Sequence, residues 1–302
     1  MSHRSTWPRL IAVAGVFPAA LAFAQAGPPA TDVFLAPLAI DGDKITVGTT
    51  TNISADPGYD NQPSFLPDAS AVLFTSGRDG KQTDIYRYDV AGKKLEQLTH
   101  TDENEYSPLV AADWNSFTCV RGAEQSLYRF DLDGSHPRLA YQHGSALIGY
   151  YVWTGPNEVA TFILGDEEKK IPHTLQVIDT GSGKAVTIAS DPGRSLLRHP
   201  GTDRISFVSK ATPEHWQLQE FDIKTHAVTT LTEMPKDVED LAWLPDGRVL
   251  AGKGSKLFVW KSGAAWAEVA DLSGAGIGNL TRLAVSSDGH WLALVGEPGN
   301  KE

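Results

Sequence analysis

Two short stretches contain the residue types of phosphate and calcium loops. Gly181-Ser-Gly-Lys184 resembles the end of a phosphate loop, which also needs a glycine five positions before Gly183 and Ser or Thr after the lysine. Ile178 and Ala185 stand there instead. Asp131-Leu-Asp-Gly134 has two acids and a glycine, but it lacks the third ligand and the distal glutamate of a calcium loop. We therefore interpret both stretches as hairpin turns.

Residues that could serve catalysis or bind metal are dispersed along the chain. No two histidines have ligand spacing on one element, and His136 and His143 flank an expected link between repeat units. A zinc ion held by distant loops and an acid pair for glycosidic chemistry both stay open, because sequence does not give the separations. The nucleophile motif Gly-x-Ser-x-Gly does not occur. The sequence therefore predicts no catalytic residue, no metal site and no cofactor.

The tryptophans raise the question of sugar stacking. Trp153 and Trp243 occupy strand positions of a repeat described below, so we expect them in the core. Trp216 follows the loop-like stretch Ala211-Thr-Pro-Glu-His215 and is the better surface candidate.

Composition and charge limit the partners. The chain has 302 residues and a formal net charge of −11. Such acidity predicts no binding to nucleic acid, whose phosphates recruit Lys and Arg, and it is poorly suited to an anionic membrane surface. Cys119 is the single cysteine, so no intrachain disulfide is expected. It lies in a strand-like run and is interpreted as a small buried hydrophobe.

The first 26 residues have the order of a secretory signal peptide. Arg4 and Arg9 precede the apolar run Leu10–Phe23, and small residues around Ala24 and Ala26 form two cleavage sites. The run contains Gly15 and Pro18 and is shorter than the roughly 20 residues that span a bilayer, so no membrane insertion is expected. We predict cleavage near Ala24 or Ala26 and a periplasmic or secreted, monomeric protein of residues 27–302.

A repeat of about 44 residues organises the rest of the chain. An Asp or Asn that turns into a strand recurs at Asp68, Asp113, Asn157, Asp203, Asp246 and Asp288. Apolar runs follow these markers, and alternating strands such as Ile85–Val90 come next. A period of roughly 40–45 residues is typical of a four-stranded propeller blade. The sequence thus predicts an all-β, six-bladed β-propeller of four-stranded antiparallel blades.

The sixth unit ends after two strands, and the first residues supply the missing pair. Asp32–Leu38 and Lys44–Ile53 are strand-like and are separated by a turn at Asp41-Gly-Asp43. We expect this N-terminal hairpin to complete the C-terminal blade. Closure matters because an unpaired blade exposes sheet edges.

The repeat phrases carry a family resemblance. Pro63–Phe74, Ile85–Val90 and Leu241–Leu250 resemble the WD-like repeats of the TolB-type six-bladed β-propeller family. The resemblance covers residues 32–302 and implies the fold and an exported compartment. The family's namesake carries a separate α/β domain ahead of its propeller, and this chain resembles the propeller half only.

Position in the propeller suggests a binding site at the channel mouth. Residues just before each innermost strand should line the rim, and they are more polar and aromatic than the strands. The candidates are Asn61, Tyr106, Tyr150, Glu239 and Arg282. Two long loops, Gly165–His173 and Lys210–Trp216, should overhang the same face, which makes His173 and Trp216 secondary candidates.

Two functions fit these features. The first is an exported binding or scaffold protein that presents its channel mouth to a protein or peptide partner. The second is an exported propeller enzyme, lactonase-like or glycan-processing, with a metal in the central channel. The sequence favours a protein that is not an enzyme, but fold alone does not choose between the two.

Overall fold

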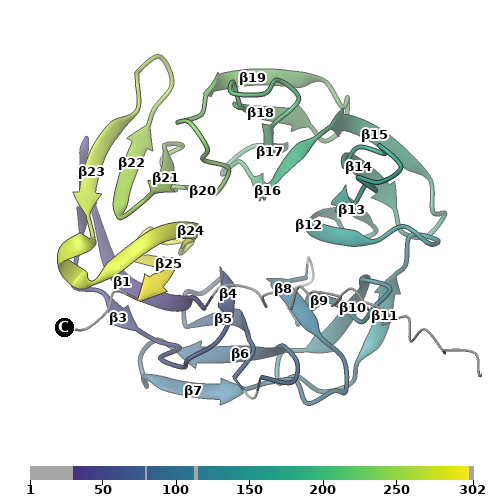
Figure 1. Ribbon diagram of the computed structural model, residues 1–302, viewed down its shortest axis with the longest axis horizontal. Coiled ribbons are helices and arrows are strands. Elements are labelled where there is room, and N and C mark those ends of the chain that lie inside the picture. The colour runs from purple at the N-terminus through teal and green to yellow at the C-terminus, as the bar shows by residue number, and fades with distance from the viewer. Residues whose placement is uncertain (1–29, 79, 112–114, 299–302) are drawn as a thin grey trace, which may run out of the picture.

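The computed structural model is an all-β molecule, and it describes residues 30–78, 80–111 and 115–298. The expected signal peptide lies outside these residues. Six sheets stand around a central axis in a ring, as Figure 1 shows. The six-bladed propeller expected from the repeat is confirmed. The only helical element in the described residues is a single 3-10 turn, η1 (Ser273–Ala275).

Five blades are continuous in sequence, and each runs from its innermost to its outermost strand. They are β4 (Asp60–Phe65), β5 (Ala71–Ser76), β6 (Asp84–Asp89) and β7 (Lys94–Gln97); β8 (Glu105–Val110), β9 (Ser116–Arg121), β10 (Ser126–Asp131) and β11 (Arg138–Tyr141); β12 (Ile148–Gly155), β13 (Glu158–Ile163), β14 (Thr174–Asp179) and β15 (Ala185–Ser190); β16 (Pro192–Arg198), β17 (Arg204–Ser209), β18 (Gln217–Asp222) and β19 (Val228–Glu233); and β20 (Leu241–Trp243), β21 (Val249–Lys253), β22 (Lys256–Trp260) and β23 (Ala267–Asp271).

The sixth blade joins the two ends of the described chain. It contains β24 (Ile277–Val285), β25 (Trp291–Pro298), β1 (Asp32–Asp41), β2 (Lys44–Val47) and the short β3 (Thr51–Asn52). Asp32 pairs with Gly296 and Pro37 with Trp291, so β1 lies antiparallel to β25. Figure 1 shows purple β1 beside yellow β25. The expected closure by the N-terminal hairpin is therefore confirmed.

The pattern of burial explains why the second strand of each blade has the longest apolar run. All of β5 is buried, whereas β15 and β19 are mostly exposed. A second strand is covered on both faces by neighbouring blades, so no alternation with polar residues is needed. Six core clusters fill the spaces between blades. Cys119 belongs to one of them and is fully buried, as expected.

Candidate functional site at the channel mouth

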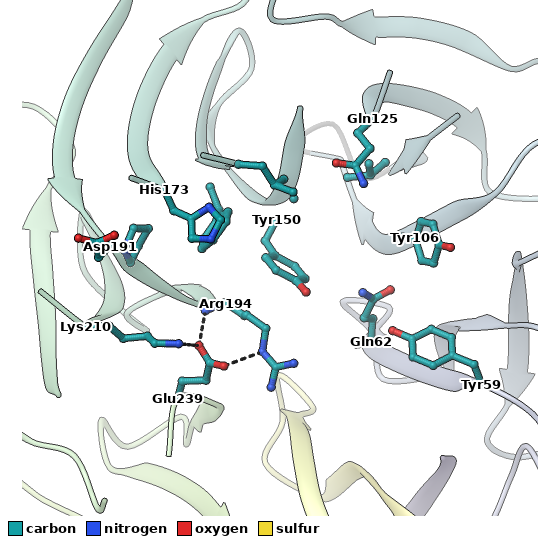
Figure 2. A pocket seen from close by; sticks show the side chains of 15 residues that line it. Tyr59, Gln62, Tyr106, Gln125, Tyr150, His173, Asp191, Arg194, Lys210 and Glu239 are labelled. Carbon is teal, nitrogen blue, oxygen red and sulfur yellow. Dashed lines mark hydrogen bonds and ion pairs between the residues drawn. The ribbon is translucent and has the colours of Figure 1, made fainter. Parts of the chain in front are cut away.

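The central channel has two chemically different ends. All six innermost strands run in the same direction, so their first residues gather at one end of the channel and their last residues at the other. A cavity of about 640 Å³ opens at the first end, which we call the mouth. Its walls are Tyr59, Gln62, Tyr106, Val120, Gln125, Gly149, Tyr150, Phe162, Leu164, His173, Asp191, Pro192, Arg194, Lys210 and Glu239 (Figure 2).

Register irregularities near the mouth set the direction of these side chains. β4 pairs irregularly with β5 between Asn61 and Ser64, and β8 pairs in the same way with β9 between Tyr106 and Leu109. Gln62 and Ser107, at equivalent places in these irregularities, have positive φ angles of 58° and 55°. β12, β16 and β24 carry shifts in their first halves as well. Such bulges re-aim side chains, and they are common beside functional sites.

One wall of the mouth is aromatic and rich in uncharged hydrogen-bonding groups. Tyr59, Tyr106 and Tyr150 place phenol rings around the cavity, and Figure 2 shows Gln62 beside Tyr59, on the side towards Tyr150. No hydrogen-bond partner of the three hydroxyls is found in the described part of the chain. The buried Oε1 of Gln125 also lacks one there. Burial raises the pKa of Tyr59 to about 12, so its hydroxyl stays a donor even at moderately alkaline pH.

Gln62 ties this wall to the fold. Its Oε1 accepts hydrogen bonds from Thr75 Oγ1 at 2.9 Å and from the backbone N–H of Ser107 at 2.8 Å. Both acceptor positions of the oxygen are thereby used, and they link blade one to blade two. The amide nitrogen remains as the group that can donate to a ligand.

The opposite wall is charged and internally paired. Glu239 Oε1 lies 3.0 Å from Arg194 Nε, and its Oε2 lies 3.3 Å from Lys210 Nζ (Figure 2). The backbone N–H of Arg194 donates to the same Oε2 at 3.2 Å. Lys210 Nζ also lies 4.4 Å from the centre of the Trp216 ring. The carboxylate of Glu239 is therefore neutralised by two cations from blade four.

A second acid lies deeper and holds two arginines. Asp240 is 7% exposed and lies 2.5 Å from Arg194 Nη2 and 3.3 Å from Arg282 Nη1. Burial raises the pKa of Asp240, and the two guanidinium groups oppose that shift. The Arg282 guanidinium stacks 4.7 Å from the centre of the Tyr150 ring. The charged and aromatic walls are thus joined through Arg282.

Four of the seven residues singled out in the sequence line the mouth cavity, namely Tyr106, Tyr150, Glu239 and His173. Arg282 lines a smaller space of about 100 Å³ further along the channel. The side chain of Asn61 is buried and accepts a hydrogen bond from the backbone of Gln62, so it shapes the bulge instead of lining the cavity. Trp216 packs against the core between blades four and five, beneath Lys210.

Sequence reasoning missed Tyr59, Gln125 and Arg194. Arg194 directly precedes Ser195, which the repeat register places at the rim. Pro192 on β16 pairs with Ser209 on β17, and Leu196 pairs with Phe207. Between these two pairs β16 therefore contains more residues than β17. This irregularity changes which residue of β16 faces the cavity, and no pattern in the sequence predicts it. Tyr59 could have been found by its place one residue before β4.

A channel metal does not fit the residues present. In the described ranges no group of three or more His, Cys, Asp or Glu side chains could hold a metal ion. The two channel acids Glu239 and Asp240 are already bound by Arg194, Lys210 and Arg282. The loops that resemble ion sites are turns. Asp131 binds His136 and Arg138, and the Asp179 carboxylate caps Ser182.

Two buried acids lie next to the mouth residues. Asp60 is 1% exposed, and neither carboxylate oxygen has a hydrogen-bond partner among the described residues. Glu105 is fully buried; its Oε1 accepts from Thr101 Oγ1 at 2.9 Å, and Arg121 Nε lies 3.7 Å away. Burial raises the pKa of Asp60 to about 6 and that of Glu105 to about 7. Each acid opens an innermost strand, immediately before Asn61 or Tyr106.

Solved structures of other proteins share this architecture. A protein assigned as TolB from Agrobacterium tumefaciens superposes with a TM-score of 0.65 at 16% identity, covering 89% of this chain and 99% of that one. TolB from Acinetobacter baumannii gives 0.54 at 15% identity, covering 89% of this chain and 64% of that one. In fold, the chain is similar to these TolB propellers. No family model and no curated protein matches the sequence.

Enzymes share the TolB-like architecture too. An oligogalacturonate lyase from Vibrio parahaemolyticus has a TM-score of 0.51 at 14% identity, covering 91% of this chain and 100% of that one. Likeness at such identities establishes the fold and leaves the function to the site. None of the helices in the described residues has the length and apolar character that crossing a membrane requires.

Proposed function

We propose that this TolB-like propeller is an exported binding protein that receives a segment of a partner protein or peptide in its channel mouth. The observation that carries the proposal is the set of unused hydrogen-bonding groups around one cavity. Three phenols and two primary amides converge there from the first three blades and the segment that leads into them. Peptide groups offer matching donors and acceptors at regular intervals, and Tyr is among the residues that most often dominate protein interfaces.

The charged wall supports binding in preference to acid–base catalysis. Glu239 and Asp240 are each bound by two cations, so neither carboxylate is available as a base in this arrangement. A mouth of about 640 Å³ lies within the range of roughly 300–1,000 Å³ that is typical of ligand sites. Two rim loops, 164–173 and 210–216, contribute His173 and Lys210 and enlarge the contact surface.

Site-specific photo-crosslinking tests the proposal. A photoreactive phenylalanine analogue at Tyr106 should yield an adduct with a discrete partner in the exported fraction. The same analogue at Val186, which is 38% exposed on outermost strand β15, is the control. Adding Tyr150→Ala to the Tyr106 crosslinker should reduce the adduct several-fold, since truncating an interface anchor costs at least about 2 kcal/mol. Equal adducts at Tyr106 and Val186 would reject the mouth as the site.

The exported location is part of the same proposal and has its own test. The residues before Thr31 carry the order of a signal peptide, and the TolB-like fold is compatible with an exported compartment. Intact-mass analysis of protein from the periplasm or medium should give a chain that begins after Ala24 or Ala26. A chain that begins at Met1 would contradict export by cleavage.

A further inference from the structure

The channel end opposite the mouth, which we call the apolar end, is a second cavity of different chemistry. It measures about 860 Å³ and is formed by the last residues of the innermost strands. Each of the six interblade cores contributes a partly buried hydrophobic side chain to its wall. These side chains are Phe65, Val110, Val152, Trp153, Leu197 and Val285. The apolar end is therefore where all six cores meet solvent.

The tryptophans of the apolar end present hydrocarbon to the cavity. Trp153 Nε1 donates to Thr118 Oγ1 at 2.9 Å, and Trp243 Nε1 donates to Ser206 Oγ at 2.8 Å. Both polar atoms of the indoles are thus satisfied within the fold. A ligand that enters this cavity gains free energy by removing apolar surface from water. It finds no indole N–H group to bind.

The edge of the apolar end, which we call the lip, carries one charged side chain among the described residues. Arg198 is the only charged residue among the described residues that line the apolar end. Its Nη2 donates to the backbone oxygens of Trp153 at 3.4 Å and of Thr154 at 3.0 Å, so the guanidinium is tethered across the boundary of blades three and four. The nearby Asp203 carboxylate is bound by Lys224 Nζ at 2.7 Å. Arg198 therefore keeps donors available for an anion.

From these features we infer that the apolar end binds a small amphipathic carboxylate whose bulky apolar body fills the cavity and whose carboxylate pairs with Arg198. The body is bulky because the walls come from all six blades, and the volume lies within the roughly 300–1,000 Å³ of small-molecule sites. One acidic group suffices because the lip offers one cation. The inference is independent of the proposed mouth function, since the two cavities share no lining residue.

Binding of 1-pyrenebutyrate, followed by fluorescence anisotropy, tests this inference. We expect saturable binding at one site, and weaker binding of the uncharged analogue 1-pyrenebutanol. Arg198→Gln should weaken pyrenebutyrate about tenfold, the effect of losing a hydrogen bond to a charged group, and leave pyrenebutanol unchanged. Arg198→Glu should weaken pyrenebutyrate further. Arg138→Gln, at an arginine of outermost strand β11, is the matched control and should bind like the parent.

Location in the cavity has a separate readout. Energy transfer from protein tryptophan to bound pyrene should fall in Trp153→Phe, because this indole lines the apolar end. Absence of saturable binding would overturn the inference. Equal loss of both probes in Arg198→Gln would do the same, because it would remove the role of the carboxylate. Concentration-dependent dimerisation that the probe blocks would identify a second copy as the occupant and would also overturn it.

Discussion

At the scale of single residues, the acids near the mouth differ in how deeply they are buried and in which cations pair with them. Glu239 and Asp240 are neighbours in sequence and share Arg194, while Lys210 pairs with Glu239 alone and Arg282 with Asp240 alone. Asp60 and Glu105 are buried with few partners, and the pKa of both carboxyls is raised. Acids near the channel mouth therefore lie in different electrostatic surroundings, although their residue types are alike.

The raised pKa values predict an unusual pH dependence of stability. A carboxyl whose pKa is higher in the folded state stabilises the fold fully below its unfolded pKa, and this stability is lost as pH rises through the folded value. The stabilisation from Asp60 is therefore lost as the pH rises to about 6, and that from Glu105 as the pH rises to about 7. At about 1.4 kcal/mol per pH unit, the two groups together contribute a loss of up to about 4 kcal/mol between about pH 5 and pH 8.

Urea denaturation of the parent and of Asp60→Asn/Glu105→Gln measures this effect. The amides cannot ionise, so the variant should lose less stability than the parent between about pH 5 and pH 8. Asp203→Asn is a control, because the pKa of this exposed carboxyl is lowered by Lys224 and it titrates below that range. An identical pH slope in parent and double variant would show that the two acids do not carry the dependence.

A second residue-scale prediction concerns Arg282. Its side chain is 13% exposed and pairs with buried Asp240, so it is part of the fold as well as of the channel. Arg282→Met should destabilise the protein by about 3 kcal/mol, the cost of removing one partner of a buried ion pair. Adding Asp240→Asn removes the acid left with fewer partners and should restore part of that loss. Denaturant unfolding of the four proteins in a double-mutant cycle gives the coupling; simple additivity would contradict the pairing.

At the scale of elements, β1 and the short β2 and β3 decide whether the ring closes. β1 supplies Val33 and Leu35 to the core between blades six and one, and Phe34 and Leu38 to the core between blades five and six. Alternate residues of one strand therefore hold the sixth blade to both of its neighbours. This arrangement is possible because successive strand side chains point to opposite faces.

Deleting residues 30–54 should abolish folding. Six large buried hydrophobic side chains would be lost together with buried Ala36, namely Val33, Phe34, Leu35, Leu38, Ile45 and Ile53. At about 1.5 kcal/mol each, their burial is worth roughly 9 kcal/mol, against a total stability of about 5–15 kcal/mol for a domain. Circular dichroism and light scattering should show loss of the native transition and aggregation. Cooperative melting near the parent's temperature would make the hairpin dispensable.

At the scale of the whole molecule, closure couples all blades. Each of the six cores is shared by two neighbouring blades, so no blade has a core of its own. We therefore predict a single cooperative unfolding transition, with calorimetric and van't Hoff enthalpies that agree. Separate transitions of subsets of blades, as an open repeat array can show, would contradict this coupling.

The sequence by itself determined the fold. The recurring Asp or Asn marker, the apolar second strands and the unpaired strands at the two ends suffice for six blades and their closure, because strand burial and turn chemistry are local and repeat in every unit. The same patterns identified the turns at Asp131 and Gly181 and the buried position of Cys119. They also placed Tyr106, Tyr150 and Glu239 at the end of the channel where the structure has them.

Only the tertiary structure decided which side chains face the channel and how they are paired. A bulge shifts the register of a strand by a residue or more, and it brought Arg194 into the mouth while Asn61 turned inward. The ion pairs of Asp240 with Arg194 and Arg282 join three blades across long sequence separations. The apolar end likewise exists only where six cores converge. The strand register at the bulges and the meeting of the six cores both depend on the closed ring. The sequence of a single repeat therefore does not determine them.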